Sequence, residues 1–368
     1  MKAATKPIQR PHDARLLVVG ADGLFHHSER ALLPDNLDPG DLLIANDAAT
    51  VPASLSGVHG RTGTAVEVRL AARPSMDTDE GREFTAVIFG PGDHRTPTEH
   101  RLPPPPLAAG DLLTLGPLEA TIVRTLDHPR LVALRFAGSV DDMWAGITRH
   151  GKPIQYAHVA EPLALWDVWT RIASLPVAFE PPSAGFVLDW RLLRRLAERQ
   201  IGFSTLTHAA GISSTGDPRL DARLPFDEPY YLPENTVRAI ATAKARGGRV
   251  VALGTSVTRA LEDAARDTAG LCTGSGLATL RIGAGTPLRV VDAIVSGVHE
   301  PGESHYELLR AFADDTVLER MLVALEQRGY RSHEFGDSVL VERQLRTCDL
   351  LHRERLPVEV AARCRRRL

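Results

Sequence analysis

Cysteine is scarce in this chain of 368 residues, and the cysteines that occur do not form a metal-binding motif. They are Cys272, Cys348 and Cys364. They have neither CxxC spacing nor the neighbouring histidines of a zinc site, so we expect reduced thiols and no bound metal. A structural disulfide is not expected in a reducing compartment.

Long apolar runs are missing as well. No stretch approaches the roughly 20 apolar residues that span a bilayer, and no apolar segment of the signal-peptide type follows Met1. We therefore expect a cytoplasmic protein with no membrane contact. Hydrophobic residues make up 43% and charged residues 24% of the chain, which is typical of packed domains and excludes a disordered or fibrous chain. The length favours two domains.

The chain also lacks an excess of positive charge, since its formal net charge is -3. Proteins that bind nucleic acid strongly are usually basic, so the overall charge does not predict such a partner. The segment 343–368 is an exception because it is rich in arginine. Its composition is typical of an arm that contacts phosphates, but a solvated helix end is the commoner explanation.

Several common catalytic and nucleotide-binding motifs are absent. No glycine-rich loop ends in GK[ST], and no GxGxxG follows a strand, so neither a Walker A loop nor a dinucleotide site is predicted. No HExxH motif is present, and no Ser-His-Asp order can be argued.

The order of the expected elements predicts an α/β fold with an inserted antiparallel β-barrel. Short strand-like runs with turn-rich connections fill residues 64–138, and helical periodicity is absent there. After residue 139 helices and strands alternate, which indicates α/β layers around a partly parallel sheet. We therefore predict a discontinuous α/β catalytic domain over residues 1–63 and 139–368 and a barrel domain over 64–138.

Individual elements are predicted in the second half of the chain. Helices are expected over residues 187–200, 236–246, 258–266, 303–312 and 316–328, and strands over residues 203–206, 249–253, 287–295 and 338–342. Asn235 is the expected N-cap of the helix 236–246.

The clearest local signal for a site is the strand 249–253, which runs into Gly254, Thr255 and Ser256 and then into a helix. The first amides of a helix lack intrahelical partners and favour an anion. Open α/β sheets bind ligands at the edge where such strands end. A ligand carboxylate would suit these amides, with the two hydroxyls adding contacts. The same residues also suit an ordinary strand-to-helix turn.

Two further loops are candidates for ligand contact. Residues 179–186 form a rigid loop of small residues in which Ser183 would cap the following helix. Such a loop, with Gly185, lets a flat ring approach the backbone, although it also suits a plain turn before a helix. The polar loop 207–217 is either a substrate lid or a flexible surface loop.

Titratable residues follow other expected strands and turns. His299 and Glu300 come after a strand, a usual position for acid–base chemistry, although such a pair is also common on surfaces. Asp337 is a turn residue or an acceptor for a ribose hydroxyl. The basic segment 149–156 is typical either of an acceptor or nucleotide contact or of a charged turn.

Taken in order, these segments resemble the S-adenosylmethionine:tRNA ribosyltransferase-isomerase family of queuosine biosynthesis. The resemblance runs from about residue 15 to 340. Residues 39–47 are similar to the family's PGDLLVxND, 182–185 to its PTAG, and 253–262 to its VGTTSxRxLE. The later matches are Val291-Asp292 to VD, His299, Pro301 and Ser304 to NFHLPxS, and Tyr330-Arg331 and Gly336-Asp337 to YRFxSxGD.

The resemblance implies the same fold, a large α/β domain carrying an inserted β-barrel. It also implies that S-adenosylmethionine is a substrate, with no further cofactor and no metal. The implied reaction transfers and rearranges its ribosyl group onto 7-aminomethyl-7-deazaguanine in tRNA, releasing adenine and methionine. On this basis we assign acid–base chemistry to His299 and Asp337, and substrate binding to Ser183, Gly185, Gly254, Thr255, Ser256, Arg259, Asp292 and Tyr330. The make-up of the segment 149–156, rather than the resemblance, suggests that the acceptor contacts Arg149, Gln155 and Tyr156.

Some segments depart from the family pattern. They include residues 48–51, 186–188, 151–156, 207–213 and 226–229. The departures lie mainly at positions expected to hold the acceptor, the tRNA or the general acid. Three alternatives therefore stay open: a small-molecule amine as acceptor, a protein that binds S-adenosylmethionine or a nucleoside without turnover, and another chemistry on S-adenosylmethionine such as cleavage of the sulfonium with no acceptor.

Overall fold

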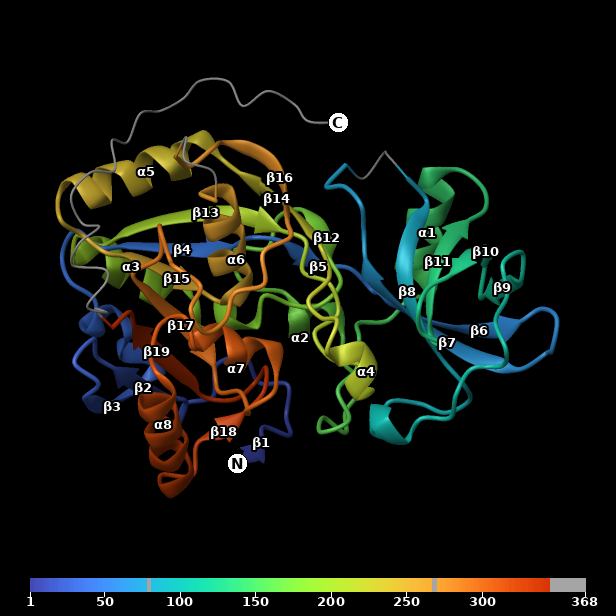
Figure 1. Cartoon of the computed structure of the whole chain (residues 1–368), viewed down its shortest axis with the longest axis horizontal. Helices are drawn as coiled ribbons and strands as arrows, with labels where there is room; N and C mark the ends of the chain where they lie inside the picture. The colour runs from blue at the N-terminus through green and yellow to red at the C-terminus, as the bar shows by residue number, and fades with distance from the viewer. Residues whose placement is uncertain (78–80, 267–269, 345–368) are drawn as a thin grey trace.

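The computed structural model describes residues 1–77, 81–266 and 270–344, so Cys348, Cys364 and most of the arginine-rich segment 343–368 lie outside the described residues. Figure 1 shows a large sheet with helices on both faces beside a separate, smaller β-barrel. The predicted fold class, α/β with an inserted antiparallel barrel, is confirmed.

The larger part is built on a nine-stranded sheet of order β16-β14-β13-β4-β15-β17-β19-β2-β3. At its centre β13, β4, β15 and β17 run parallel. Every residue of β4 and β15 is buried, as expected of strands covered on both faces. The strands are β16 (Gly274–Ala278), β14 (Glu228–Leu232), β13 (Gly202–His208), β4 (Leu42–Asn46), β15 (Val250–Leu253), β17 (Ala293–Gly297), β19 (Ser338–Glu342), β2 (Arg15–Val19) and β3 (Phe25–Glu29).

Helices cover both faces of this sheet and complete its two cores. One face packs against α5 (Glu234–Ala245), α6 (Thr255–Ala264), α7 (Ser304–Leu309) and α8 (Asp315–Gln327). The opposite face packs against α3 (Trp190–Glu198) and the 3-10 helix η1 (Arg30–Asn36). This three-layer arrangement leaves the ends of the parallel strands accessible to loops.

The smaller part is a closed antiparallel barrel of order β10-β11-β8-β7-β6-β9. Helix α1 (Val140–His150) follows the last barrel strand and contributes Met143 and Ile147 to the barrel's apolar core. The predicted start of the insertion at residue 64 falls after β6, which already pairs with β7 and β9. The barrel strands are β6 (Ser54–His59), β7 (Ala65–Ala72), β8 (Glu83–Phe89), β9 (Leu112–Leu115), β10 (Leu118–Thr125) and β11 (Leu131–Phe136).

Short elements connect or extend these two parts. Strand β12 pairs in parallel with β5, and β1 with β18. Figure 1 shows β5, β12 and α4 between the large sheet and the barrel. The short elements are β1 (Lys2–Ala3), β5 (Ala49–Thr50), η2 (Thr98–His100), α2 (Leu165–Val168), β12 (Pro176–Ala178), η3 (Ser183–Val187), α4 (Pro218–Asp221) and β18 (Arg331–Ser332).

One predicted strand boundary differs from the structure because of a contact with a helix distant in sequence. The strand expected over 287–295 begins only at Ala293, because the Glu262 carboxylate accepts hydrogen bonds from the amides of Arg289, Val290 and Val291 and holds them outside the sheet.

Two predicted helix caps are wrong. Asn235 lies inside α5, which already begins at Glu234. Ser183 begins the separate 3-10 helix η3, and the side chain of Asp189 caps α3 instead. The strand predicted over 338–342 matches β19.

Candidate active site at the carboxyl edge of the parallel strands

A cavity of about 310 Å³ lies beyond the carboxyl ends of the parallel strands; we call it the inner chamber. Its walls come from the loops after β12, β13, β15 and β17 and from the first turns of α6 and α7. Ligands of open α/β sheets bind at this edge. Among the predicted site residues the inner chamber brings together Ser183, Gly254, Thr255, Ser256, Arg259 and His299.

Gly254 makes the close turn from β15 into α6. Its φ of 103° is a conformation that favours glycine, and a Cβ atom there would lie 3.2 Å from the Ala184 side chain. The Gly254 amide donates to the carbonyl of Val295 at 2.8 Å, which fixes the turn against β17. The first turn of α6, with Thr255 and Ser256, therefore faces the inner chamber.

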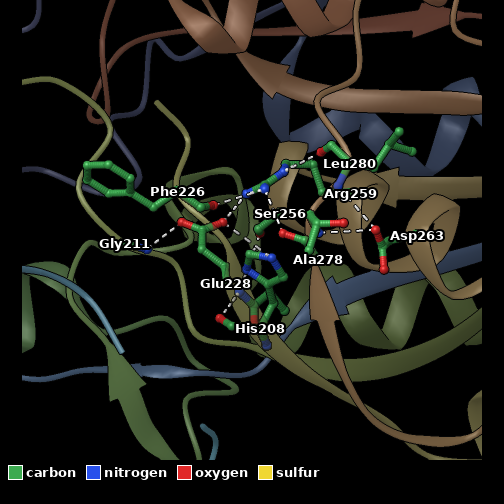
Figure 2. A network of polar contacts seen from close by, with 11 residues as sticks. His208, Gly211, Phe226, Glu228, Ser256, Arg259, Asp263, Ala278 and Leu280 are labelled. Atoms are coloured by element: carbon green, nitrogen blue, oxygen red, sulfur yellow. Dashed lines mark hydrogen bonds and ion pairs between the residues drawn. The ribbon is translucent and has the colours of Figure 1, made fainter. Parts of the chain in front are cut away.

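Arg259 belongs to a buried ion pair rather than standing free in the inner chamber. Its guanidinium contacts the Glu228 carboxylate and donates to the carbonyl oxygens of Phe226, Ala278 and Leu280 at 3.1, 3.0 and 3.2 Å (Figure 2). These contacts join α6 to β14 and β16. Most of the donors of Arg259 are thus used by the protein itself.

Glu228 and His208 extend this network toward the end of β13. The Glu228 carboxylate accepts from the Gly211 amide at 2.6 Å and lies 3.4 Å from Nε2 of His208. Burial raises the pKa of Glu228, and burial together with the charge of Arg259 lowers the pKa of His208 well below its usual value. His208 is therefore a neutral imidazole at physiological pH.

Asn46 connects three elements at the floor of the site. Its amide Nδ2 donates to the carbonyl of His208 at 2.9 Å and to Oγ of Ser256 at 3.3 Å, while Oδ1 accepts from the His208 amide at 3.0 Å. The side chain thus fixes the end of β13 against the start of α6. The sequence signal for it was a polar residue at the end of a fully buried strand.

A second cavity of about 550 Å³, the outer chamber, lies between these loops and the barrel. It is lined by the predicted residues Gln155 and Tyr156 and by Arg69 of the barrel. The two chambers are continuous, because seven lining residues belong to both. These shared residues are Glu180, Ser213, Asp221, His299, Gly302, Ser304 and His305.

The two predicted acceptor residues in the outer chamber differ in availability. Gln155 is held at both ends, since Nε2 donates to the carbonyl of Pro153 at 3.0 Å and Oε1 accepts from the Leu163 amide at 2.9 Å. Oη of Tyr156 is buried and has no hydrogen-bond partner among the residues that the structure describes. Tyr156 is therefore the better placed of the two to contact a ligand.

Histidines and a carboxylate form the rim shared by the chambers. The rings of His299 and His305 stack at 4.5 Å, and Nδ1 of His299 lies 3.2 Å from the Glu303 carboxylate. Burial lowers the pKa of His305 to about 3, so this ring stays neutral. Burial would raise the pKa of Glu303, but the hydrogen bond and charge of His299 hold it at about 2. Glu303 is therefore an anion that orients His299.

Two carboxyl groups facing the outer chamber have opposite pKa shifts. Burial raises the pKa of Glu180 to about 8, against the effect of a hydrogen bond from Ser213. Burial also disfavours the anion of Glu334, but His158, whose Nε2 lies 3.5 Å from the carboxylate, and the charge of His333 keep its pKa below the usual value. Such diverging pairs are typical of acid–base sites. Neither residue was selected from the sequence.

Asp337 lies outside both chambers, and its predicted acid–base role is corrected. Its fully buried carboxylate accepts from the amides of Arg15 and Arg331, both at 2.8 Å, and pairs with the Arg15 guanidinium. These contacts fix strands β2 and β18. Tyr330 is also a structural residue, since its hydroxyl contacts Nδ1 of His27 at 2.9 Å beneath Arg15.

The remaining predicted residues also lie elsewhere. Asp292 accepts from the Val250 amide at 2.9 Å at the amino ends of β15 and β17, the opposite edge of the sheet. Arg149 is exposed on α1 and donates to the carbonyl of Ala145. Gly185 is buried inside η3, where a Cβ atom would lie 2.9 Å from Thr170. None of the three lines a chamber.

The described residues contain neither a metal-binding cluster nor a membrane-spanning helix. In residues 1–77, 81–266 and 270–344, no three His, Cys, Asp or Glu side chains gather in a way that would hold a metal ion. No helix in the same ranges has the length and apolar character to cross a membrane.

Comparison with known proteins agrees with the order of motifs in the sequence. The family described as "Queuosine biosynthesis protein" matches residues 1–341. The chain belongs to this family. Similar members include the S-adenosylmethionine:tRNA ribosyltransferase-isomerase of Pelobacter propionicus, which is 32% identical over 349 residues, covering 92% of this chain and 96% of the relative. The protein of that name from Thermus thermophilus is 32% identical over 339 residues, covering 90% and 93%.

A solved structure is also similar. It is the crystal structure of S-adenosylmethionine tRNA ribosyltransferase from Thermotoga maritima, with a TM-score of 0.48 and 23% sequence identity. The similarity covers 92% of this chain and 95% of that chain.

Proposed function

We propose that this chain is an S-adenosylmethionine:tRNA ribosyltransferase-isomerase of queuosine biosynthesis. The observation that carries the proposal is the family match over residues 1–341. The continuous inner and outer chambers support it, because the reaction must bring a sulfonium nucleoside and an amine acceptor together. S-adenosylmethionine is the substrate in this proposal, and no further cofactor is required.

The inner chamber would hold S-adenosylmethionine. The amides that begin α6 and the hydroxyls of Thr255 and Ser256 suit the carboxylate of its methionine part. Ser183 and Ala184 come from a turn of small residues that suits the flat adenine or ribose. Arg259 supports this wall through Glu228 rather than as the carboxylate's direct ligand.

His299 is the proposed base for the first chemical step. The sulfonium acidifies the neighbouring ribose C5′–H, and a base must remove this proton. His299 lines both chambers, and the Glu303 anion at its Nδ1 would stabilise the imidazolium that forms. Adenine then leaves, the acceptor amine bonds to C1′, and methionine departs as the sugar rearranges to an epoxycyclopentane.

A cationic cleft supports tRNA as the carrier of the acceptor. A third cavity, of about 600 Å³, lies between the barrel and the α/β part. Its lining includes Arg73, Arg124, Arg223 and Arg281, against Glu83 and Asp227. Arg281 also lines the inner chamber, so the cleft leads to the site. Clustered arginines suit phosphates, which favours a polyanionic acceptor over a small amine.

Product analysis tests the proposed function. The purified protein is incubated with S-adenosylmethionine and either deazaguanine-bearing tRNA, unmodified tRNA or no tRNA, and the small molecules and digested nucleosides are analysed by mass spectrometry. We expect equal amounts of adenine and methionine, with an epoxycyclopentane-bearing nucleoside, only with the deazaguanine-bearing tRNA. Formation of S-adenosylhomocysteine, or tight binding without release of adenine, would contradict the proposal.

A further inference from the structure

Glu180 occupies the junction of the two chambers and is held there from both sides. The preceding residue, Phe179, packs into the barrel core, and its amide donates to the carbonyl of Ala210 at 2.8 Å. Pro181 and Pro182 follow it and restrict the backbone. The Ser213 hydroxyl donates to the Glu180 carboxyl from the loop after β13. The Glu180 side chain therefore lines both chambers and is held in a fixed position.

The surroundings keep this carboxyl protonated at neutral pH. Glu180 is only 8% exposed, and burial is the main cause that raises its pKa to about 8. Among charged groups, Glu334 raises this pKa and Arg69 lowers it, both across the outer chamber. A neutral carboxyl in such a position is a proton donor at physiological pH.

We propose that Glu180 is the acid–base residue that protonates the departing adenine and then deprotonates the attacking amine. This inference rests on the proposed function. In the inner chamber the carboxyl proton moves to an adenine nitrogen as the C1′–N9 bond breaks and its electron pair stays on adenine. In the outer chamber the lone pair of the acceptor nitrogen bonds to C1′, and the Glu180 carboxylate takes a proton from that nitrogen. Glu180 is thereby returned to its starting form.

The other titratable groups shared by the chambers are less suited to this role. Asp221 already accepts from the amides of Thr215 and Gly216 and from the Thr215 hydroxyl. His305 has a pKa of about 3, so its ring is neutral at physiological pH and has no acidic proton to give to adenine. His299 is bound to the Glu303 anion and serves the separate C5′ step. Among the titratable residues that line both chambers, Glu180 is therefore the protonated acid.

Glu180→Gln tests the inference, because glutamine keeps the shape and a hydrogen-bond partner for Ser213 but cannot transfer the proton. We expect adenine release to slow by ~10²-fold or more while S-adenosylmethionine affinity, measured by calorimetry, stays unchanged. The matched control is Glu161→Gln, which removes an exposed carboxylate outside all three cavities and should keep full activity. Glu180→Asp should retain part of the rate.

The pH profile of the unaltered protein provides a readout independent of any variant. Because the protonated form of Glu180 is the active one, kcat should fall as the pH rises through about 8, and this fall should be absent from the residual rate of Glu180→Gln. Three results would each overturn the inference but not the proposed function. They are a wild-type profile without the alkaline fall, a fully active Glu180→Gln variant, and a Glu180→Gln variant that loses S-adenosylmethionine binding. If the wild-type protein releases no adenine, the proposed function fails first and the inference fails with it.

Discussion

Arg259 is the residue whose interpretation changes most between sequence and structure. Its position after Gly254, Thr255 and Ser256 suggests a ligand for a carboxylate. In the folded chain its guanidinium pairs with Glu228 and donates to three carbonyl oxygens, and its side chain is 6% exposed. Arg259 therefore joins α6 to β14 and β16, and in the proposed site it would support the wall of the inner chamber rather than bind the ligand.

Arg259→Ala should therefore destabilise the protein. It would leave the buried Glu228 carboxylate without its partner, and the loss of one member of a buried pair typically costs about 3–5 kcal/mol. We expect a drop of this size in the free energy of unfolding, measured by urea denaturation. The double variant Arg259→Ala/Glu228→Gln should recover part of it. Unchanged stability with a sharp loss of S-adenosylmethionine affinity would instead make Arg259 a direct ligand.

The buried carboxyl of Glu180 gives a prediction for stability against pH. A carboxyl whose pKa in the folded protein is raised above its unfolded value favours the fold at low pH, and this contribution is lost as the pH rises toward the folded pKa. Here that window runs from 4.5 to about 8. Glu180→Gln should thus become more stable than the wild-type protein as the pH increases through this window, as measured by thermal unfolding. A constant difference across the window would contradict the shift.

A position beside a strand end was enough to locate some of the predicted residues at the inner chamber, but it did not reveal contacts between distant segments. His299 and Ser256 follow strands whose carboxyl ends meet, and both line the inner chamber. Asp337 also lies beside a strand, but its carboxylate forms an ion pair with Arg15, which is remote in sequence. The shifted pKa of Glu180 depends on burial between the barrel and the sheet, for which local sequence carries no signal.

At the scale of elements, the turn from β15 into α6 is the proposed binding surface for the methionine carboxylate. Its geometry depends on Gly254, with φ at 103° and the Ala184 side chain close by. Any side chain there imposes backbone strain and pushes against η3, the opposite wall of the inner chamber.

Gly254→Ala should weaken S-adenosylmethionine binding by ~10-fold or more and lower the free energy of unfolding by about 1–3 kcal/mol. The control is Gly247→Ala, because Gly247 has a φ of 79° at the end of α5, with no atom within 4 Å of the added Cβ. Both variants carry backbone strain, but only the first adjoins the site. Equal losses of affinity in the two variants, measured by calorimetry, would contradict the assignment of this turn to ligand binding.

The elements themselves were largely predictable because their apolar patterns are local. The run of buried residues in β15 and the predicted range of β19 both follow from sequence. The start of β17 could not be predicted from the sequence. The apolar segment before it donates its amides to the carboxylate of Glu262, a contact made across the fold. The helices α5 and α6 begin at Glu234 and Thr255, a few residues before the predicted starts at 236 and 258.

At the scale of the whole molecule, the barrel and the α/β part together make surfaces that neither has alone. The cationic cleft combines Arg73 and Arg124 of the barrel with Arg223 and Arg281 of the α/β part. The net charge of -3 gives no indication of it, since the arginines come from separated segments. The fold class was predictable from the order of strands and helices, but this juxtaposition was not.

The double variant Arg124→Glu/Arg223→Glu tests the cleft as a binding surface for tRNA. We expect tRNA affinity to fall by ~10-fold or more and its dependence on salt concentration to become less steep, because phosphate contacts are lost. S-adenosylmethionine affinity should not change. The charge-matched control is Arg194→Glu/Arg238→Glu, on the exposed surfaces of α3 and α5. An equal loss of tRNA affinity in the control would assign the effect to overall charge.

The most direct test of the whole account is a crystal structure of the protein with S-adenosylmethionine bound in the absence of tRNA. We expect the methionine carboxylate at the amides of Thr255 and Ser256, and the adenine in contact with Glu180, with the outer chamber left open for the acceptor. A ligand bound outside the inner chamber, or one with its amino-acid end turned away from the start of α6, would contradict it.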